Sequence, residues 1–223
     1  MCATPEARGS TARFAVALSG RGSTFRALHD AMLAGGVPGE VCGVFSDQPA
    51  AYGVATARER GLPTATLSPR DFPTREGFDA AFGDLIAASS PDWILLAGYM
   101  RVLSPAFCTR FAGRLLNIHP SLLPLYPGLH TYQRALAEGV AEHGSTVHFV
   151  TAELDGGPRI AQTRVRVLAG DTVETLSARV QAAERKLYPE VAGWAATGRL
   201  EWNAGRPRLD GMPLDSPRDV ALP

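Results

Sequence analysis

The stretch RFAVALSGRGSTFRALHDAMLA, residues 13–34, decides the fold class of this chain. It opens on a short apolar run, residues 13–18, which ends at the glycine-containing segment SGRGST, residues 19–24. The apolar side chains that follow recur at the spacing of one helix face, namely Phe25, Leu28, Met32 and Leu33. This order predicts a strand, a glycine turn and a helix, which is the first unit of an alternating α/β fold.

The same alternation continues toward the C-terminus. EVCGVFSD (40–47) and LPTATL (62–67) predict strands on either side of a helix over residues 50–61. An amphipathic helix over residues 75–89 then precedes a buried strand over residues 92–97. Because strands that alternate with helices form parallel sheets, we expect an α/β fold with a single doubly wound, mostly parallel sheet.

A capped helix, a strand and a loop come next. Ser104 and Pro105 have the residue types of a helix cap and a first helical position. Residues 114–118 predict a further strand. The run HPSLLPLYPGLHTY (119–132) contains too much proline for a helix or a sheet interior, and it predicts a shaped loop.

The last part of the chain predicts an antiparallel addition to the sheet. Strands over residues 145–151 and 159–168 flank LDGGP (154–158), whose Asp-Gly pair indicates a tight turn. A long helix is expected over residues 173–197. We found no internal repeat and no linker that would divide the chain.

We therefore expect one domain with short ends. Residues 1–12 are expected to be a flexible N-terminal segment, residues 13–205 the folded domain, and residues 206–223 a loose C-terminal tail. The length of 223 residues suits a single α/β domain.

Composition favours small-molecule partners. Lys plus Arg and Asp plus Glu both total 22, so no net positive field attracts nucleic acid or an anionic membrane. The sequence contains no apolar run near the roughly 18 residues of a membrane span and no secretion signal, and we expect a cytoplasmic protein. Cys2, Cys42 and Cys108 are too few and too far apart for a disulfide framework.

Three segments contain residues that could bind a substrate or catalyse a reaction. Gly20 and Gly22 free backbone amides at a helix start, where a phosphate can bind, although a simple tight turn is the alternative. Asn117 and His119 lie two apart at a strand end, where they share one side of the sheet and can stabilise the oxyanion of an acyl transfer. Asp155 is equally well explained as a turn residue.

A metal site is not expected from the histidines or the cysteines. His130, His143 and His148 lack the spacing of known zinc motifs such as HExxH, and the cysteines provide no ligand cluster. We therefore expect an activity without a metal.

The segment LLNIHPSLLPLYPGLHTY, residues 115–132, closely resembles the phosphoribosylglycinamide formyltransferases of purine biosynthesis. The likeness continues in family order through SGRGST, VFSD, LAGYMRVLSPAF, HGSTVHFV, ELDGGP and RVQAAERKLYP. It extends from about Arg13 to beyond Leu200. The resemblance implies a Rossmann-like formyltransferase fold and a folate-dependent enzyme.

The family's functional residues transfer to matching positions in this sequence. The resemblance implies that the catalytic residues are Asn117, His119 and Asp155. It implies contacts to the substrate phosphate from Gly22, Ser23 and Thr24, where relatives commonly have Asn at the last position. Contacts to the glycinamide part are implied for Glu184 and Gln181. Folate contacts are implied for Arg75, Met100, Arg101, Val102, Leu103, Asn117, Thr151, Ala152, Glu153, Leu154 and Asp155.

The implied reaction transfers the formyl group of 10-formyltetrahydrofolate, a co-substrate, to the primary amine of glycinamide ribonucleotide. The amine attacks directly through a tetrahedral oxyanion, and Asp155 is expected to raise the pKa of His119. Alternatives are a formyltetrahydrofolate deformylase, another folate-dependent formyltransferase such as one acting on aminoacyl-tRNA, or a non-catalytic module on the same fold. The balanced charge disfavours a tRNA substrate, and we do not expect a deformylase, because deformylases usually carry an added N-terminal domain that the residues before Arg13 are too few to form.

Overall fold

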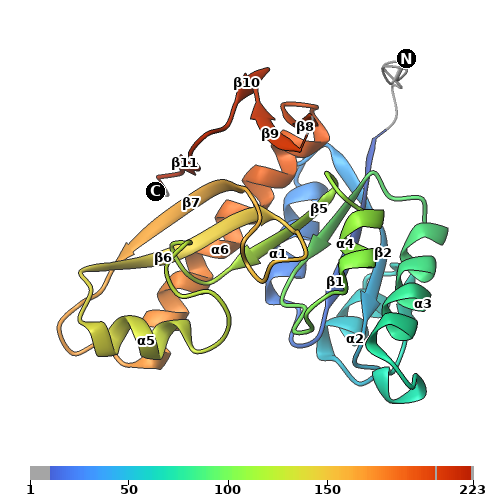
Figure 1. Cartoon of the computed structure of the whole chain (residues 1–223), viewed down its shortest axis with the longest axis horizontal. Coiled ribbons are helices and arrows are strands. Elements are labelled where there is room, and N and C mark those ends of the chain that lie inside the picture. Colours follow the sequence, from blue (N-terminus) through green and yellow to red (C-terminus); the bar gives the residue numbers. More distant parts are fainter. Residues whose placement is uncertain (1–10, 204, 222–223) are drawn as a thin grey trace.

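A computed structural model describes residues 11–203 and 205–221 (Figure 1). The first ten residues of the segment expected to be flexible lie outside this range. Within it, eight strands form the main sheet, and their bounds in chain order are β1 (Ala12–Leu18), β2 (Gly39–Ser46), β3 (Thr64–Thr66), β4 (Trp93–Leu96), β5 (Leu115–His119), β6 (Glu142–Phe149), β7 (Arg159–Arg166) and β11 (Arg218–Asp219). Their spatial order is β11-β7-β6-β5-β4-β1-β2-β3.

The pairing of these strands confirms the expected fold class. The first five strands run parallel, in the order β3-β2-β1-β4-β5. Strands β6 and β7 continue the sheet in antiparallel pairing, which is the expected addition near the C-terminal end. The strand order reverses between β1 and β4, and open α/β sheets bind ligands beside the carboxyl ends of strands at such a point.

Helices cover both faces of the sheet. The helices are α1 (Ser23–Leu33), α2 (Tyr52–Glu59), the short 3-10 helix η1 (Pro69–Asp71), α3 (Arg75–Ala88), α4 (Pro105–Arg110), α5 (Thr131–Glu138) and α6 (Val173–Ala196). Side chains of α1, α2 and α6 form one buried cluster with Phe14, Val16 and Leu18 of β1. Side chains of α3 and α4 form a second cluster with Ala15 and Ala17. Alternate residues of β1 thus point to opposite faces, as the pleat of a strand requires.

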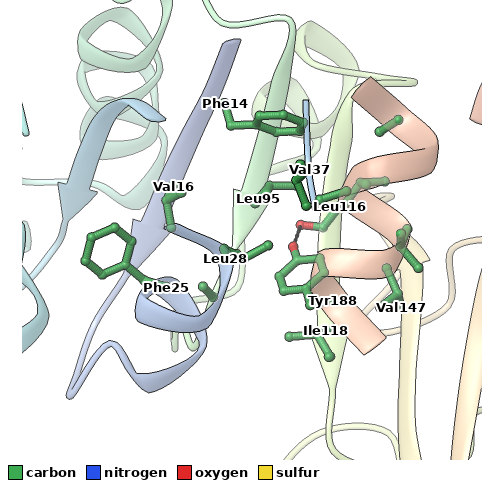
Figure 2. Packing of buried hydrophobic residues seen from close by; sticks show 14 of the residues in the cluster. Phe14, Val16, Phe25, Leu28, Val37, Leu95, Leu116, Ile118, Val147 and Tyr188 are labelled. Atoms are coloured by element: carbon green, nitrogen blue, oxygen red, sulfur yellow. Dashed lines mark hydrogen bonds between the residues drawn. The ribbon is translucent and has the colours of Figure 1, made fainter. Parts of the chain in front are cut away.

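Tyr188 joins the long helix α6 to the centre of the sheet (Figure 2). Its ring is fully buried among apolar side chains that include Leu28 and Ile118. Its hydroxyl donates a hydrogen bond of 3.0 Å to the carbonyl oxygen of Leu116 on β5. This bond satisfies a polar group that would otherwise be costly to bury.

Two details of the central region differ from the sequence expectation. Helix α5 begins at Thr131, inside the run expected as a loop. Strands β6 and β7 are joined by residues 150–158, a longer connection than the expected tight turn, although the Gly156 N–H donates to the Glu153 carbonyl at 3.2 Å and closes a turn inside it. The segment returns closely along β6, because a Cβ at Gly157 would overlap the carbonyl oxygen of Phe149.

Residues 206–223, expected as a loose tail, form paired strands over their described part. β9 (Arg206–Leu209) and β10 (Met212–Pro213) make a small antiparallel sheet with β8 (Leu200–Asn203), which lies within the expected domain, and β11 adds to the edge of β7. The Trp202 ring packs at 4.6 Å between centroids on Phe149. Leu209 is also buried, so this segment has an apolar side that the sheet and α6 cover.

None of the helices in the described part of the chain combines the length and the apolarity that a membrane crossing needs.

Candidate active site

Asn117 and His119 lie at the carboxyl end of β5, next to the point where the strand order reverses. As residues two apart on a strand, they point to the same side of the sheet. Asn117 pairs in register with Leu96 of β4 and with His148 of β6. His119 is 7% exposed, so its imidazole is held almost entirely by protein.

The loop between β6 and β7 brings Asp155 to these residues. His119 Nδ1 lies 3.4 Å from Asp155 Oδ2, and His119 Nε2 lies 2.9 Å from the carbonyl oxygen of Tyr126. The Gly128 N–H donates to Asp155 Oδ2 at 2.8 Å. Asp155 has a left-handed backbone with φ of 51°, a conformation that Asp tolerates better than most residues. The structure therefore gathers all three residues predicted to be catalytic.

The electrostatics of His119 differ from the expectation in their net effect. Burial lowers the pKa of His119, because water no longer stabilises the imidazolium. The Asp155 carboxylate raises this pKa, as expected, but the burial effect is larger and the net pKa lies below its ordinary value. The expected direction of the Asp155 contribution is therefore confirmed, although the pKa of His119 stays below its ordinary value. For Asp155, burial opposes ionisation, but His148 and His119 lower its pKa overall.

His148 belongs to the same group, although the sequence suggested no role for it. Its Nε2 lies 3.2 Å from Asn117 Nδ2 and 3.6 Å from Asp155 Oδ1. The ring is 2% exposed. Only the antiparallel register of β5 and β6 places it opposite Asn117, and the sequence contains no signal of that register.

The predicted phosphate loop lies at the start of α1. Gly22 is the residue before the helix, with φ of 71°, and no described side chain caps this end. A Cβ at Gly22 would lie 2.8 Å from Gly53 Cα, so close packing also requires glycine here. A surface cavity of about 420 Å³, lined in part by Gly20, Arg21 and Tyr52, borders the loop. The backbone amides and hydroxyls of Ser23 and Thr24 can hydrogen-bond an anion at this position.

The two residues predicted to hold the glycinamide part lie on α6. Glu184 is buried, accepts a 3.0 Å hydrogen bond from the Ser145 hydroxyl, and has a pKa raised to about 7 by burial. Gln181 lies one helical turn earlier and is exposed. The phenol of Tyr132 interacts with both residues. The Tyr132 ring also contacts His143, which packs on Tyr126 beside His119.

The residues predicted to bind folate lie around α4 at the same edge of the sheet. Met100 and Val102 expose apolar side chains after β4, and Leu154 exposes another in the loop after β6. The Cys108 thiol of α4 donates to the carbonyl oxygen of Thr151 at 3.3 Å, which joins α4 to that loop. Ala152 and Glu153 are exposed beside Leu154.

A buried carboxylate supports the segment from Met100 to Leu103. The Ser104 N–H donates to Asp79 Oδ2 at 2.6 Å, and Asp79 is 1% exposed. The Arg101 guanidinium lies 4.7 Å above the Phe78 ring. Arg75 begins α3 on the surface, where its positive charge favours the ionised form of the Cys108 thiol. The sequence did not predict a role for Asp79.

The described residues contain no group of three or more His, Cys, Asp or Glu side chains arranged to hold a metal ion.

Comparison with known proteins agrees with this geometry. Residues 12–192 match the formyl transferase family. The "Phosphoribosylglycinamide formyltransferase" of Escherichia coli (strain K12) is 49% identical over 199 residues, which cover 89% of this chain and 94% of that protein. The protein of the same name from Mycobacterium tuberculosis (strain CDC 1551 / Oshkosh) is 43% identical over 83% of this chain and 86% of its own length.

A solved structure provides an independent comparison. The phosphoribosylglycinamide formyltransferase of Coxiella burnetii superposes with a TM-score of 0.90 at 41% identity, over 95% of this chain and 100% of that one. Family, close relatives and fold agree along nearly the whole described chain. The chain therefore belongs to the formyl transferase family, among the phosphoribosylglycinamide formyltransferases.

Proposed function

We propose that this chain transfers the formyl group of 10-formyltetrahydrofolate to the primary amine of glycinamide ribonucleotide, a step of de novo purine (IMP) biosynthesis. The observation that carries the proposal is the group formed by Asn117, His119, His148 and Asp155 beside the strand-order reversal. An oxyanion-stabilising group at that place suits acyl transfer to an amine. The partners are then two dissolved small molecules, neither nucleic acid nor a membrane, and we propose the cytoplasm as the location.

The reaction needs no covalent enzyme intermediate. The substrate amine forms a bond to the formyl carbon, the formyl oxygen takes up negative charge, and the bond from that carbon to N10 of the folate then breaks. The proton lost by the amine ends on N10, so the products are formylated ribonucleotide and tetrahydrofolate. No metal is used in this scheme.

Asn117 and His119 divide the stabilisation of the oxyanion between them. Both ring nitrogens of His119 face protein acceptors, the Tyr126 carbonyl and the Asp155 carboxylate. We therefore assign His119 the role of a nearby positive charge. Burial lowers the pKa of His119, and Asp155 offsets part of this effect by favouring the charged ring. Asn117 can donate an amide N–H directly to the oxygen on which charge develops.

The ribonucleotide is proposed to extend from the start of α1 to Glu184 on α6. Its phosphate is assigned to Gly22, Ser23 and Thr24, because the uncapped helix start favours an anion. Its glycinamide part is assigned to Glu184 and Gln181. The buried Glu184 carboxylate can pair with a donor on the substrate and so recover part of the free energy lost on desolvation.

The folate is proposed to lie on the other side of Asn117, near α4. The exposed apolar side chains of Met100, Val102 and Leu154 fit the flat face of a pterin ring, and backbone groups of residues 100–103 and 151–155 can hydrogen-bond its edge. Arg75 offers a positive charge to an acidic end of the molecule. The residues present therefore fit this co-substrate.

A direct assay tests the proposal. Purified protein is incubated with 10-formyltetrahydrofolate, with and without glycinamide ribonucleotide, and tetrahydrofolate and formylated ribonucleotide are quantified. We expect tetrahydrofolate to appear only with the ribonucleotide, in equal amount to the formylated product. Equal folate turnover without the ribonucleotide would instead indicate a deformylase.

A further inference from the structure

Ser19 is hydrogen-bonded to two neighbouring loops at the carboxyl edge of the sheet, and none of the assignments above includes it. It follows β1 directly and begins the SGRGST segment. Its backbone N–H donates to the Gly98 carbonyl at 3.0 Å. Its hydroxyl accepts from the Met100 N–H at 2.9 Å and donates to Asp47 Oδ1 at 2.5 Å.

These bonds join the ends of three strands. Ser19 follows β1, Asp47 follows β2, and Met100 comes after β4, so one hydroxyl lies between all three loops. Asp47 is 2% exposed, and its second oxygen accepts from the Gln48 side chain at 3.1 Å. A hydroxyl has a single proton, and Ser19 donates it to the Asp47 carboxylate in a short charge-assisted hydrogen bond. The lone pairs of Ser19 are thereby directed at the Met100 N–H.

We propose that Ser19, oriented by Asp47, is a positioning residue that holds the proposed folate segment 100–103 in register with the proposed phosphate loop 20–24. The inference rests on the proposed function, because it concerns how the protein positions two bound substrates relative to each other. Transfer between two bound molecules depends steeply on their relative placement, and a shift of about 1 Å can cost on the order of 100-fold in rate.

The two loops depend on Ser19 to different degrees. The phosphate loop has further bonds of its own, from Gly53 N–H to the Gly20 carbonyl at 3.0 Å and from Arg26 N–H to the Gly22 carbonyl at 2.9 Å. Met100 has an exposed side chain, and its amide is held by the Ser19 hydroxyl. Loss of the hydroxyl should therefore disturb the folate segment more than the phosphate loop.

The test compares variants of the full chain. Ser19→Ala removes the hydroxyl, Ser19→Thr retains one, and Ser177→Ala is a matched control on α6, where the Ser177 hydroxyl donates only to the Glu174 carbonyl. The Kd of tetrahydrofolate is measured by titration calorimetry, and the KM of each substrate and kcat are measured by the transfer assay. A urea unfolding curve checks that each variant is folded.

We expect Ser19→Ala to raise the Kd of tetrahydrofolate and the KM of the formyl folate about 5-fold, as the loss of one hydrogen bond predicts. The ribonucleotide KM should change less than 2-fold, and kcat should fall about 10-fold. Ser19→Thr should stay within about 2-fold of the wild type in all four values, and Ser177→Ala should not differ from it.

A second comparison tests the part played by Asp47. The Ser19→Ala, Asp47→Ala double variant should bind tetrahydrofolate no more weakly than the single variant with the higher Kd, since Ser19 and Asp47 act through the same hydrogen bond to Met100. Additive losses, or an equal rise in both substrate KM values in Ser19→Ala, would overturn the inference. Unchanged Kd, KM and kcat values in a folded Ser19→Ala variant would also overturn the inference. Formyl transfer by the wild type would still support the proposed function in that case. A wild type that neither transfers formyl nor binds tetrahydrofolate would overturn both.

Discussion

Asn117 and His148 face each other across the β5–β6 pair, with Asn117 Nδ2 3.2 Å from His148 Nε2. His148 Nδ1 lies 2.8 Å from the Phe149 carbonyl oxygen, which can only accept. Nδ1 therefore carries a proton, and Nε2 lies between the Asn117 amide nitrogen and Asp155 Oδ1, which is 3.6 Å away. His148 thus holds the amide end of Asn117 in place, and that amide group has a further N–H for the substrate oxygen.

Removing the Asn117 amide should therefore lower kcat far more than substrate affinity. For Asn117→Ala we expect kcat to fall about 10²–10³-fold, the usual cost of losing one oxyanion donor. His148→Ala should lower kcat about 10-fold by freeing the amide to rotate. Steady-state kinetics of the two single variants and the double variant test this relationship. A double variant whose loss equals the product of the single losses would show that His148 does not act through Asn117.

The pH profile should reveal how Asp155 acts on His119. If protonated His119 is the active form, activity falls as pH rises through its pKa. Burial already lowers that pKa and Asp155 partly restores it, so Asp155→Asn should move the alkaline limb of kcat to lower pH. A folded His119→Gln variant, which lacks the titrating group, should lose this limb. An unmoved limb in Asp155→Asn with reduced kcat would mean that Asp155 works by another route.

Glu184 should make the stability of the free protein depend on pH. Its pKa is raised to about 7 from 4.5 by burial, so between these values the folded chain binds more protons than the unfolded chain. Stability should therefore fall as pH rises from about 4.5 to 7, by on the order of 3 kcal/mol from this group. Urea unfolding of Glu184→Gln should lack this decline. An identical pH dependence in both proteins would contradict the assignment.

The C-terminal strands should contribute to stability through Trp202. Its ring packs on Phe149, the residue that ends β6 directly before the Asp155 loop. Trp202→Ala removes this half-buried ring, and we expect a loss of about 2 kcal/mol in the free energy of unfolding. Leu168→Ala, at a residue that is 52% exposed, is the control and should change stability by less than about 0.5 kcal/mol. No loss in Trp202→Ala would show that the packing of β8 on Phe149 does not stabilise the protein.

Much of the fold could be predicted because local patterns decide it. Apolar runs punctuated by glycine and amphipathic periodicity located β1, α1, α3 and α6 to within about two residues, as is usual for long periodic segments. The short helix α5 was missed, because proline and glycine before it resemble a loop. The C-terminal strands were missed because their apolar residues are few, and pairing with β7 and packing on Phe149 stabilise them.

The sequence by itself determined the doubly wound α/β fold, the strand-end position of Asn117 and His119, and the likeness to formyltransferases. Tertiary structure alone decided that Asp155 reaches His119, that His148 faces Asn117, and that Ser19 joins three loops. It also decided the sign of the His119 pKa shift. The physical reason is that periodicity and turn chemistry act between neighbours in the chain. Register, burial and hydrogen bonds between distant loops exist only once the sheet has assembled.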